Sequence, residues 1–226
     1  MRVRRGAATA ALVIIAAAAC GEKSADYTSL ISPTTTPTTT TAAAAGPVPI
    51  AAYLESVGVT GEPVVPDKLT DLAVTVPTPP GWAPYQNTNL APGTRVIAKG
   101  DTYPTAMLMV FKLNGDFDVK EAVQHGYADA ELSENFKRLN ASNDNFRGFP
   151  SSMIEGSYDL NGRRMHSYNR IVFATGVAQK PNVAGQAGPP NQRYLAQLTV
   201  TGYADKAAQE APDIEVIIRG FNVAAK

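Results

Sequence analysis

The run TAMLMVFKL at residues 105–113 decides the expected fold. Its apolar side chains occur at both alternating positions, with Ala106 and Leu108 on one side and Met107 and Met109 on the other. A strand with one solvated face would alternate apolar and polar residues instead. The run therefore predicts a strand in the middle of a sheet that is covered on both faces.

The chain on either side of this run predicts further strands. Asn161-Gly162 lies between two apolar-rich segments, residues 153–158 and 164–173, and this pair favours a two-residue hairpin turn because both positions need positive φ. Alternating side chains predict strands at residues 71–76 and 194–201, and residues 94–99 form a further candidate strand that runs to a turn at Gly100-Asp101. Strands joined by hairpins indicate an antiparallel sheet.

Three helices are expected around this sheet. Apolar residues recur at helical spacing in residues 50–57 and again in residues 207–221, where Pro212 is the one awkward residue. Between them, Asp118 and Glu121 have the spacing of a capping box at the start of a helix. The sequence thus predicts an α+β fold, an antiparallel β-sheet sandwiched by α-helices, in a single domain at residues 50–226.

The N-terminus has the features of an export signal. Three arginines precede an apolar, Ala-rich run that is shorter than the roughly 20 residues needed to cross a membrane. Small residues stand directly before Cys20 and Gly21, as in the cleavage box of bacterial lipoproteins. We expect residues 1–19 to be a signal peptide and Cys20 to carry the lipid. The alternative is an ordinary secretory protein with an unpaired thiol.

A linker is expected between Cys20 and the domain. Residues 20–49 are rich in Thr, Pro and Ala and contain few large apolar side chains. Such a composition buries too little surface to offset the entropy of ordering, so we expect a disordered spacer. A bare linker and one that carries O-linked sugars are both compatible with it. The expected location is the cell membrane, with a lipid-anchored domain that faces the periplasm or cell envelope.

Composition argues against several classes of function. Lys plus Arg equals Asp plus Glu at 20 each, and no basic tract is present, so we expect no nucleic-acid partner. One Cys and two His are too few for a dedicated metal site, and no nucleotide-binding or redox motif occurs, so we expect no metal and no cofactor.

Catalytic signatures at fixed spacing are missing from the sequence as well. A serine esterase could still be assembled from His125 or His166, one of several serines, Ser151 and Ser152 among them, and an acid such as Asp159, because a triad is defined by geometry. We expect a protein that is not an enzyme and keep the esterase as an alternative.

Apolar and basic side chains supply the remaining candidates for binding. Met and aromatic residues suit a pocket for alkyl chains, although most of them are expected to form the core. The candidate ligand-binding residues are Trp82, Tyr103, Met107, Met109, Phe111 and Tyr168. Arg163, Arg164 and Arg170 could meet an anionic headgroup, or they could simply solvate a strand edge.

Four segments carry a resemblance to a known family: residues 74–82, 103–110 and 148–153, and the C-terminal strand and helix from residue 193 to 221. Together they resemble the LpqN/LpqT family of mycobacterial lipoproteins, whose fold is PsbP-like. The resemblance implies a cell-envelope lipoprotein without an established enzymatic motif. Through the LpqN branch of the family, it also implies an association with export of mycolic-acid trehalose lipids beside an RND-type transporter, and with virulence and host-protein contact.

These observations favour a tethered, non-enzymatic binding module. Its expected partners are the membrane, through the lipid anchor, and a mycolate-type glycolipid or an envelope transporter. The alternative is a surface adhesin or virulence lipoprotein that contacts a host protein with the outside of the domain.

Overall fold

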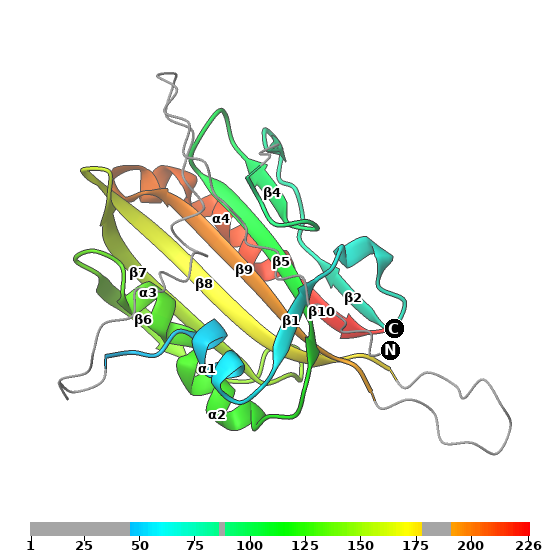
Figure 1. The fold of residues 1–226 in the computed structure, drawn as a ribbon. Coiled ribbons are helices and arrows are strands. Elements are labelled where there is room, and N and C mark those ends of the chain that lie inside the picture. The colour runs from blue at the N-terminus through cyan, green and yellow to red at the C-terminus, as the bar shows by residue number, and fades with distance from the viewer. Residues whose placement is uncertain (1–45, 86–88, 178–190) are drawn as a thin grey trace, which may run out of the picture.

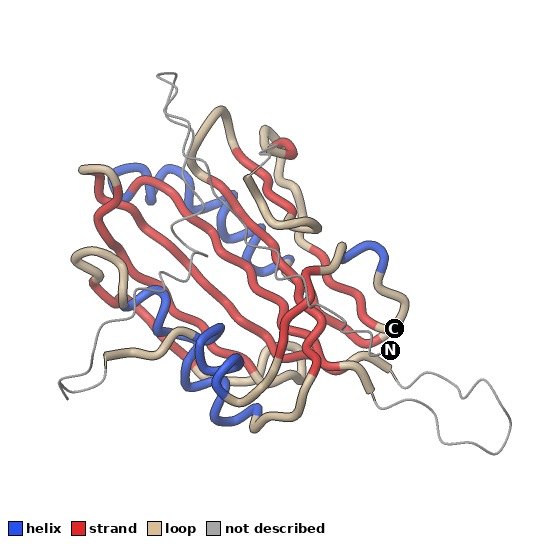
Figure 2. The backbone as a smooth tube through the Cα atoms, in the orientation of Figure 1, coloured by secondary structure: helices blue, strands red, loops and turns tan. Residues whose placement is uncertain are grey.

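The computed structural model describes residues 46–85, 89–177 and 191–226. The predicted signal peptide, Cys20 and most of the predicted linker lie outside these residues. Within them, eight strands form one antiparallel sheet in the order β3-β4-β5-β9-β8-β7-β6, and β1 pairs with β5 (Figures 1 and 2). The strands are β1 (Thr60–Pro63), β3 (Ala83–Pro84), β4 (Arg95–Ala98), β5 (Thr105–Asn114), β6 (Lys137–Ser142), β7 (Ser151–Leu160), β8 (Arg163–Thr175) and β9 (Arg193–Tyr203).

The central part of the sheet follows the sequence pattern. β5 is an internal strand, as its apolar run predicts, although β9 and not β5 lies at the middle of the strand order. β7 and β8 form the predicted hairpin, in which Asn161 and Gly162 have φ values of 50° and 72°. The predicted α+β class with a large antiparallel sheet is therefore confirmed.

One face of the sheet packs against the C-terminal part of the chain, and we call it the α4 face. It is covered by α4 (Ala207–Gly220) and by a small sheet of β2 (Leu72–Thr75) and β10 (Asn222–Ala225). Leu108 of β5, Ile217 of α4 and Phe221 are fully buried in this core. Figure 1 shows α4 behind the sheet. Pro212 lies inside the helix without ending it.

The opposite face carries the N-terminal helices, and we call it the α1 face. Its helices are α1 (Ile50–Ser56), α2 (Val119–Gln124) and α3 (Ala128–Glu131). The described residues also form the 3-10 helices η2 (Pro66–Lys68), η3 (His125–Tyr127) and η4 (Ala204–Lys206). Ile50 and Leu54 of α1 pack with Leu113 and Leu195 of the sheet. The carboxylate of Asp118 accepts the N–H groups at the start of α2, as the predicted cap requires.

Candidate functional site

The α1 face is divided into two parts along the strands. Near α1 and α2, the row formed by Phe111, Leu195 and Phe173 on β5, β9 and β8 is entirely apolar. We call this part the covered end. Figure 1 shows α1 and α2 over one end of the face and α3 beside β6 and β7.

The second part begins two residues further along each strand, and we call it the platform. Its rows across β5, β9 and β8 are Met109–Gln197–Ile171, Met107–Thr199–Asn169 and Thr105–Thr201–Ser167, and Val96 of β4 extends the middle row. Successive side chains on one face of a strand are two residues apart, so these groups point to the same side as the covered end. The platform therefore continues the face with different chemistry.

Polar side chains on β8 and β9 form a hydrogen-bonded group. Gln197 Nε2 donates to Asn169 Oδ1 and to Thr199 Oγ1, both at 3.3 Å, and Thr199 Oγ1 donates to Asn169 Oδ1 at 3.2 Å. Among the described residues, this network leaves the Asn169 amide nitrogen and the Gln197 amide oxygen without a partner. One donor and one acceptor on neighbouring strands thus remain for a ligand.

An apolar strip lies directly beside this polar group. Val96, Met107 and Met109 form a buried cluster, and none of its described members belongs to a helix. The side chains that pack against the cluster come from loops and from β5; they are Tyr85, Leu90, Tyr103 and Phe111. Loops are displaced more easily than packed helices, so this part of the face is better suited to admit a ligand than the covered end.

The platform is electrically neutral. None of the nine side chains in its three rows is an acid, a base or a histidine. At its border, burial raises the pKa of Tyr158, and a hydrogen bond with Thr201 opposes part of that rise. The phenol therefore stays protonated at neutral pH. Neutral amide and hydroxyl groups suit a hydroxyl-bearing ligand rather than an ionic one.

The structure separates the six candidate ligand-binding residues into two groups. Tyr103, Met107, Met109 and Phe111 share one cluster on the α1 face. Trp82 and Tyr168 lie in the core of the α4 face, on the other side of the sheet.

The two aromatic residues on the α4 face have local structural partners. Trp82 Nε1 donates to Asp213 of α4 at 3.2 Å, and the Tyr168 hydroxyl accepts from Arg170 Nε at 2.6 Å. The same Asp213 oxygen binds Lys99 Nζ at 2.6 Å, and these contacts lower the pKa of Asp213, with Lys99 as the main cause. Trp82 thus helps to join α4 to the rest of the domain, and Tyr168 positions Arg170 of its own strand β8.

Most of the residues named for the alternative esterase are engaged with other groups. His166 Nε2 lies 3.0 Å from Glu155 Oε1, whereas Ser151 Oγ donates to the Asp144 carbonyl at 2.6 Å. Asp159 accepts from Asn135 at 2.8 Å and from Arg164 at 3.0 Å, and these bonds lower its pKa. Ser152 Oγ is buried with no hydrogen-bond partner. No contact among the described residues joins a serine, a histidine and an acid from this set.

Neither a metal site nor a membrane-spanning helix occurs in the part of the chain that the structure describes. No group of three or more His, Cys, Asp or Glu side chains in residues 46–85, 89–177 and 191–226 is arranged to hold a metal ion. In the same ranges, no helix is long and apolar enough to span a bilayer.

Comparison with known proteins assigns the family. The family model described as "Probable lipoprotein LpqN" matches residues 46–224. Lipoprotein LpqT of Mycobacterium tuberculosis is 62% identical over 180 residues, which cover 80% of this chain and 75% of that protein. Lipoprotein LpqT of Mycobacterium leprae is 53% identical over 180 residues, with coverage of 80% and 78%.

This chain belongs to the LpqN family of lipoproteins. The expected resemblance to the LpqN/LpqT family is thereby confirmed. The fold agrees with it: the crystal structure of LpqN, described as involved in cell envelope biogenesis of Mycobacterium tuberculosis, superimposes with a TM-score of 0.61 at 19% identity. That superposition covers 79% of this chain and 98% of LpqN. A more distant relative, the proline-rich 28 kDa antigen of M. tuberculosis, is 36% identical over 177 residues, 76% of this chain and 53% of that protein.

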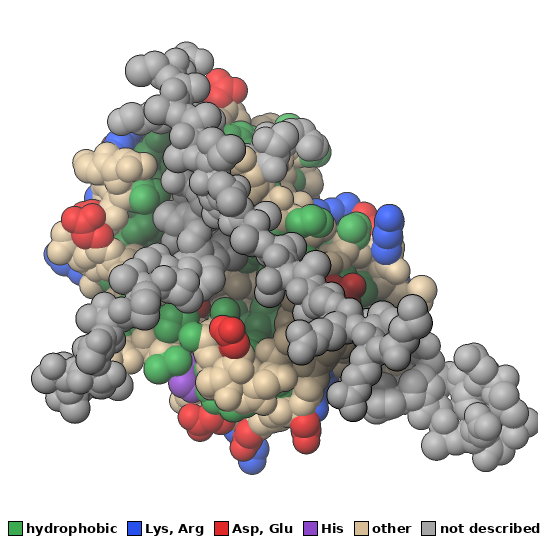
Figure 3. Space-filling model, viewed as in Figure 1, with side chains coloured by type: hydrophobic (Ala, Val, Ile, Leu, Met, Phe, Trp, Pro, Cys, Tyr) green, Lys and Arg blue, Asp and Glu red, His purple; other side chains and the backbone are tan. Residues whose placement is uncertain are grey.

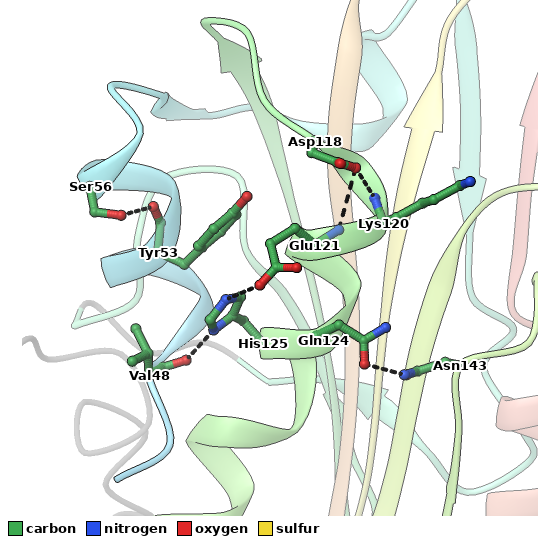
Figure 4. A network of polar contacts seen from close by, with 9 residues as sticks. All are labelled: Val48, Tyr53, Ser56, Asp118, Lys120, Glu121, Gln124, His125 and Asn143. Carbon is green, nitrogen blue, oxygen red and sulfur yellow. Dashed lines mark hydrogen bonds and ion pairs between the residues drawn. The ribbon is translucent and has the colours of Figure 1, made fainter. Parts of the chain in front are cut away.

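A second polar group ties the start of this LpqN-family domain to α2 (Figure 4). His125 Nδ1 donates to the Val48 carbonyl at 3.1 Å, and Nε2 lies 3.6 Å from Glu121 of the preceding turn. The imidazole stacks on Tyr53 of α1, with ring centres 4.3 Å apart. Glu121 therefore contacts His125 and not the backbone N–H that a full capping box would use. His125 has a structural role that accounts for its position.

The end of the domain around this contact is acidic. Glu55, Asp118 and Glu121 are exposed there, and Figure 3 shows acidic side chains gathered beside the histidine. Burial and the charges of Glu121 and Asp118 raise the pKa of Tyr53. The chain thus enters its folded domain at a negatively charged end.

Sequence reasoning missed the polar half of the platform. Asn169, Gln197 and Thr199 alternate with apolar residues, which also fits a strand with one solvated face. A signal was nevertheless available in the sequence, because a strand in the middle of a covered sheet, such as β9, is expected to carry apolar side chains on both faces. The polar side chains on one face of β9 depart from that expectation. A polar run within one face of such a strand indicates a site where something other than core packs.

Proposed function

We propose that this LpqN-family protein is a non-enzymatic binding module of the cell envelope, and that the platform holds a glycolipid. The acyl chain would lie along the methionine strip, and the sugar hydroxyls would bond to the amides of Asn169 and Gln197. Lipidation of Cys20 would hold the module at the membrane from which such a ligand comes.

One observation carries the proposal: the row Met107–Thr199–Asn169 changes from thioether to hydroxyl to amide across three paired strands. Methionine conforms to irregular alkyl surfaces, and ligand sites typically combine an apolar lining with a few placed polar groups. The absence of charged side chains in the three platform rows favours a sugar over an ionic headgroup.

Native mass spectrometry of the full chain purified from its own host tests this directly. The expected result is a co-purifying lipid with a sugar headgroup. Gln197→Leu keeps the size of the side chain and removes its polar end, so it should lower the bound fraction about tenfold, which corresponds to the loss of roughly one good hydrogen bond. Gln209→Leu on the exposed surface of α4 is the matched control and should retain the lipid.

Two outcomes would overturn the assignment. The first is a wild-type chain that carries no lipid. The second is equal loss of lipid from the platform variant and the control, because a general effect on folding or anchoring would then explain the loss.

Exposed leucines favour a protein partner as a second candidate. Leu132, after α3, is 56% exposed, and Leu139, on the edge strand β6, is 63% exposed. An envelope transporter or a host protein could contact this edge. Crosslinking from both positions in intact cells tests it: a single partner captured by both sites supports the interaction, and no shared product contradicts it.

A further inference from the structure

The arginines of this domain are of two kinds. Eight lie within the described residues, and six of these form an ion pair with a carboxylate: Arg95–Asp67, Arg138–Glu131, Arg163–Asp205, Arg164–Asp159, Arg193–Asp116 and Arg219–Glu215. The two that do not, Arg147 and Arg170, contact the same aromatic ring. Their guanidinium carbons lie 5.6 Å and 4.6 Å from the centre of Phe146.

Arg170 is held in place by neutral groups. It projects from β8 on the α4 face and is partly buried. Its Nε donates to the Tyr168 hydroxyl at 2.6 Å, and Nη1 donates to Ser151 Oγ at 3.1 Å. A partly buried cation is usually paired with an acid, yet the nearby Asp144 carboxylate accepts from the Ser142 hydroxyl instead. The positive charge of Arg170 therefore remains uncompensated among the described residues.

Arg147 stands at an unfavourable backbone position. Phe146 and Phe149 exchange two backbone hydrogen bonds of 2.8 Å and 3.0 Å, and Arg147 and Gly148 between them have φ values of 55° and 86°. These are the features of a type I′ turn, in which Asn-Gly is strongly preferred. The β7–β8 turn of this same chain has Asn-Gly. An arginine in the left-handed region costs stability that the turn itself does not require.

The site lies at the tip of this turn and beside the end of α4. Phe146 stacks on Phe221, with ring centres 5.3 Å apart, which fixes the ring against the core. Arg147 Nη2 donates to the Arg219 carbonyl at 3.2 Å. Two cations are thus positioned by a ring, a carbonyl and two hydroxyls, and their remaining N–H groups are free to bind an anion.

We propose that Arg147 and Arg170 form a binding site for a phosphate group. Two guanidinium ions match the charge of a phosphate monoester, about −2 at neutral pH, and their planar N–H groups match its oxygens. The phosphate could belong to a soluble ester or to the headgroup of an anionic lipid. The site lies on the face opposite the platform, so it does not depend on the proposed glycolipid site.

Titration of the full chain with inorganic phosphate and with glycerol 3-phosphate tests the site, with the NMR signals of the arginine Nε–H groups as the readout. The expected result is saturable shifts at Arg147 and Arg170. Arg170→Gln and Arg147→Asn should each weaken binding at least about tenfold, the usual effect of losing a charged hydrogen bond. Arg95→Ala, which removes the same charge from an exposed ion pair, should leave binding unchanged.

Arg147→Asn has a second readout that protects the test from a folding artefact. Because Asn-Gly suits a type I′ turn better than Arg-Gly, this variant should melt at a higher temperature than the wild type while it binds phosphate more weakly. Loss of binding together with loss of stability would contradict the proposed role of Arg147.

A comparison of two bilayers separates the sources of the phosphate. The full chain is placed in phosphatidylcholine nanodiscs with or without phosphatidic acid, and hydrogen exchange is measured at residues 143–150. Protection only with phosphatidic acid supports a lipid headgroup, whereas binding of glycerol 3-phosphate without such protection supports a soluble ester. Binding of neither ligand, or equal weakening by Arg95→Ala, overturns the proposal.

Discussion

The covered end and the platform belong to the same face of the same three strands, yet they differ in what packs on them. At the covered end, Leu195 and Phe173 lie against helices, and every side chain in their row is apolar. Four residues further along β9, Thr199 lies between Met107 and Asn169. Helices cover the apolar part of the face and extend to Ile171 at the border of the platform, whereas no described helix residue belongs to the cluster of Val96, Met107 and Met109. We interpret the covered end as the source of stability and the platform as the place of function.

The largest effect is expected at the covered end. Leu195→Ala removes a side chain that is 5% exposed and packs beneath α1 and α2, so the free energy of unfolding should fall by about 2–5 kcal/mol. Urea denaturation measures it. A loss below 1 kcal/mol would mean that the helices contribute little to this end and would remove the contrast with the platform.

Tyr194 precedes Leu195 on β9 and lies on the α4 face, so its substitution tests the opposite side of the sheet. Tyr194 donates to both oxygens of buried Asp71, at 3.0 Å and 3.1 Å, so Tyr194→Phe leaves a buried carboxylate without this donor. The expected loss is about 1–3 kcal/mol by urea denaturation. Tyr203→Phe is the matched control and should change stability by less than about 0.5 kcal/mol.

The same pair predicts an alkaline transition. Burial, followed by the hydrogen bond and charge of Asp71, raises the pKa of Tyr194 to about 12. A raised pKa means that the folded state holds the proton more tightly than the unfolded state, whose pKa is near 10. This contribution to stability is fully present below pH 10 and is lost as the pH rises toward 12. Tyr194→Phe should remove this part of the pH dependence, and an unchanged alkaline profile in the variant would assign it to other groups.

A smaller effect of opposite sign is expected at Ser152, on β7 beneath η3. Its buried hydroxyl has no hydrogen-bond partner, so Ser152→Ala should raise the free energy of unfolding by about 1 kcal/mol. Ser151→Ala is the control, because Ser151 donates to the Asp144 carbonyl and should lose stability when truncated. Destabilisation by Ser152→Ala would show that its hydroxyl has a partner in solution.

The smallest change in stability is expected on the platform. Thr199→Val keeps the shape of the side chain and removes one hydroxyl from the Gln197–Asn169 network, so we expect a loss of about 1 kcal/mol or less. Glycolipid binding should nonetheless weaken. A large loss of stability with unchanged binding would assign the network to the core.

The sequence predicted those parts of the fold that have a local signal. The two-sided apolar run of β5, the Asn-Gly turn and the Asp118 cap all appear where residue chemistry requires them. The short strands β1, β3, β6 and β10 were not predicted. β6 carries charged residues and a register shift after Arg138, and β10 directly follows a helix with almost no turn. These strands are set by their partners and not by their own patterns.

The candidate site could be predicted only in part, for a related reason. Aromatic and Met side chains are visible in a sequence, but strand pairing decides which face each one joins. Trp82 and Tyr168 therefore lie on the α4 face, while Tyr103, Met107 and Met109 lie together on the other face. The unpaired charges of Arg147 and Arg170 could not be predicted for the same reason, because sequence spacing does not show which arginines have a partner. The ion pairs of Arg95, Arg163 and Arg193 join residues far apart in the chain, whereas those of Arg138, Arg164 and Arg219 are local.

Methyl NMR of the methionines tests the central claim most directly. Met107 and Met109 lie on the platform, whereas Met153 belongs to the core of the α4 face and serves as an internal reference. Octyl glucoside, added below its micelle concentration, supplies one alkyl chain and one sugar. We predict saturable shifts of the Met107 and Met109 methyl groups, weakened by Gln197→Leu, with Met153 unchanged. Uniform shifts of all three methionines, or none at all, would contradict the assignment of the platform as the ligand site.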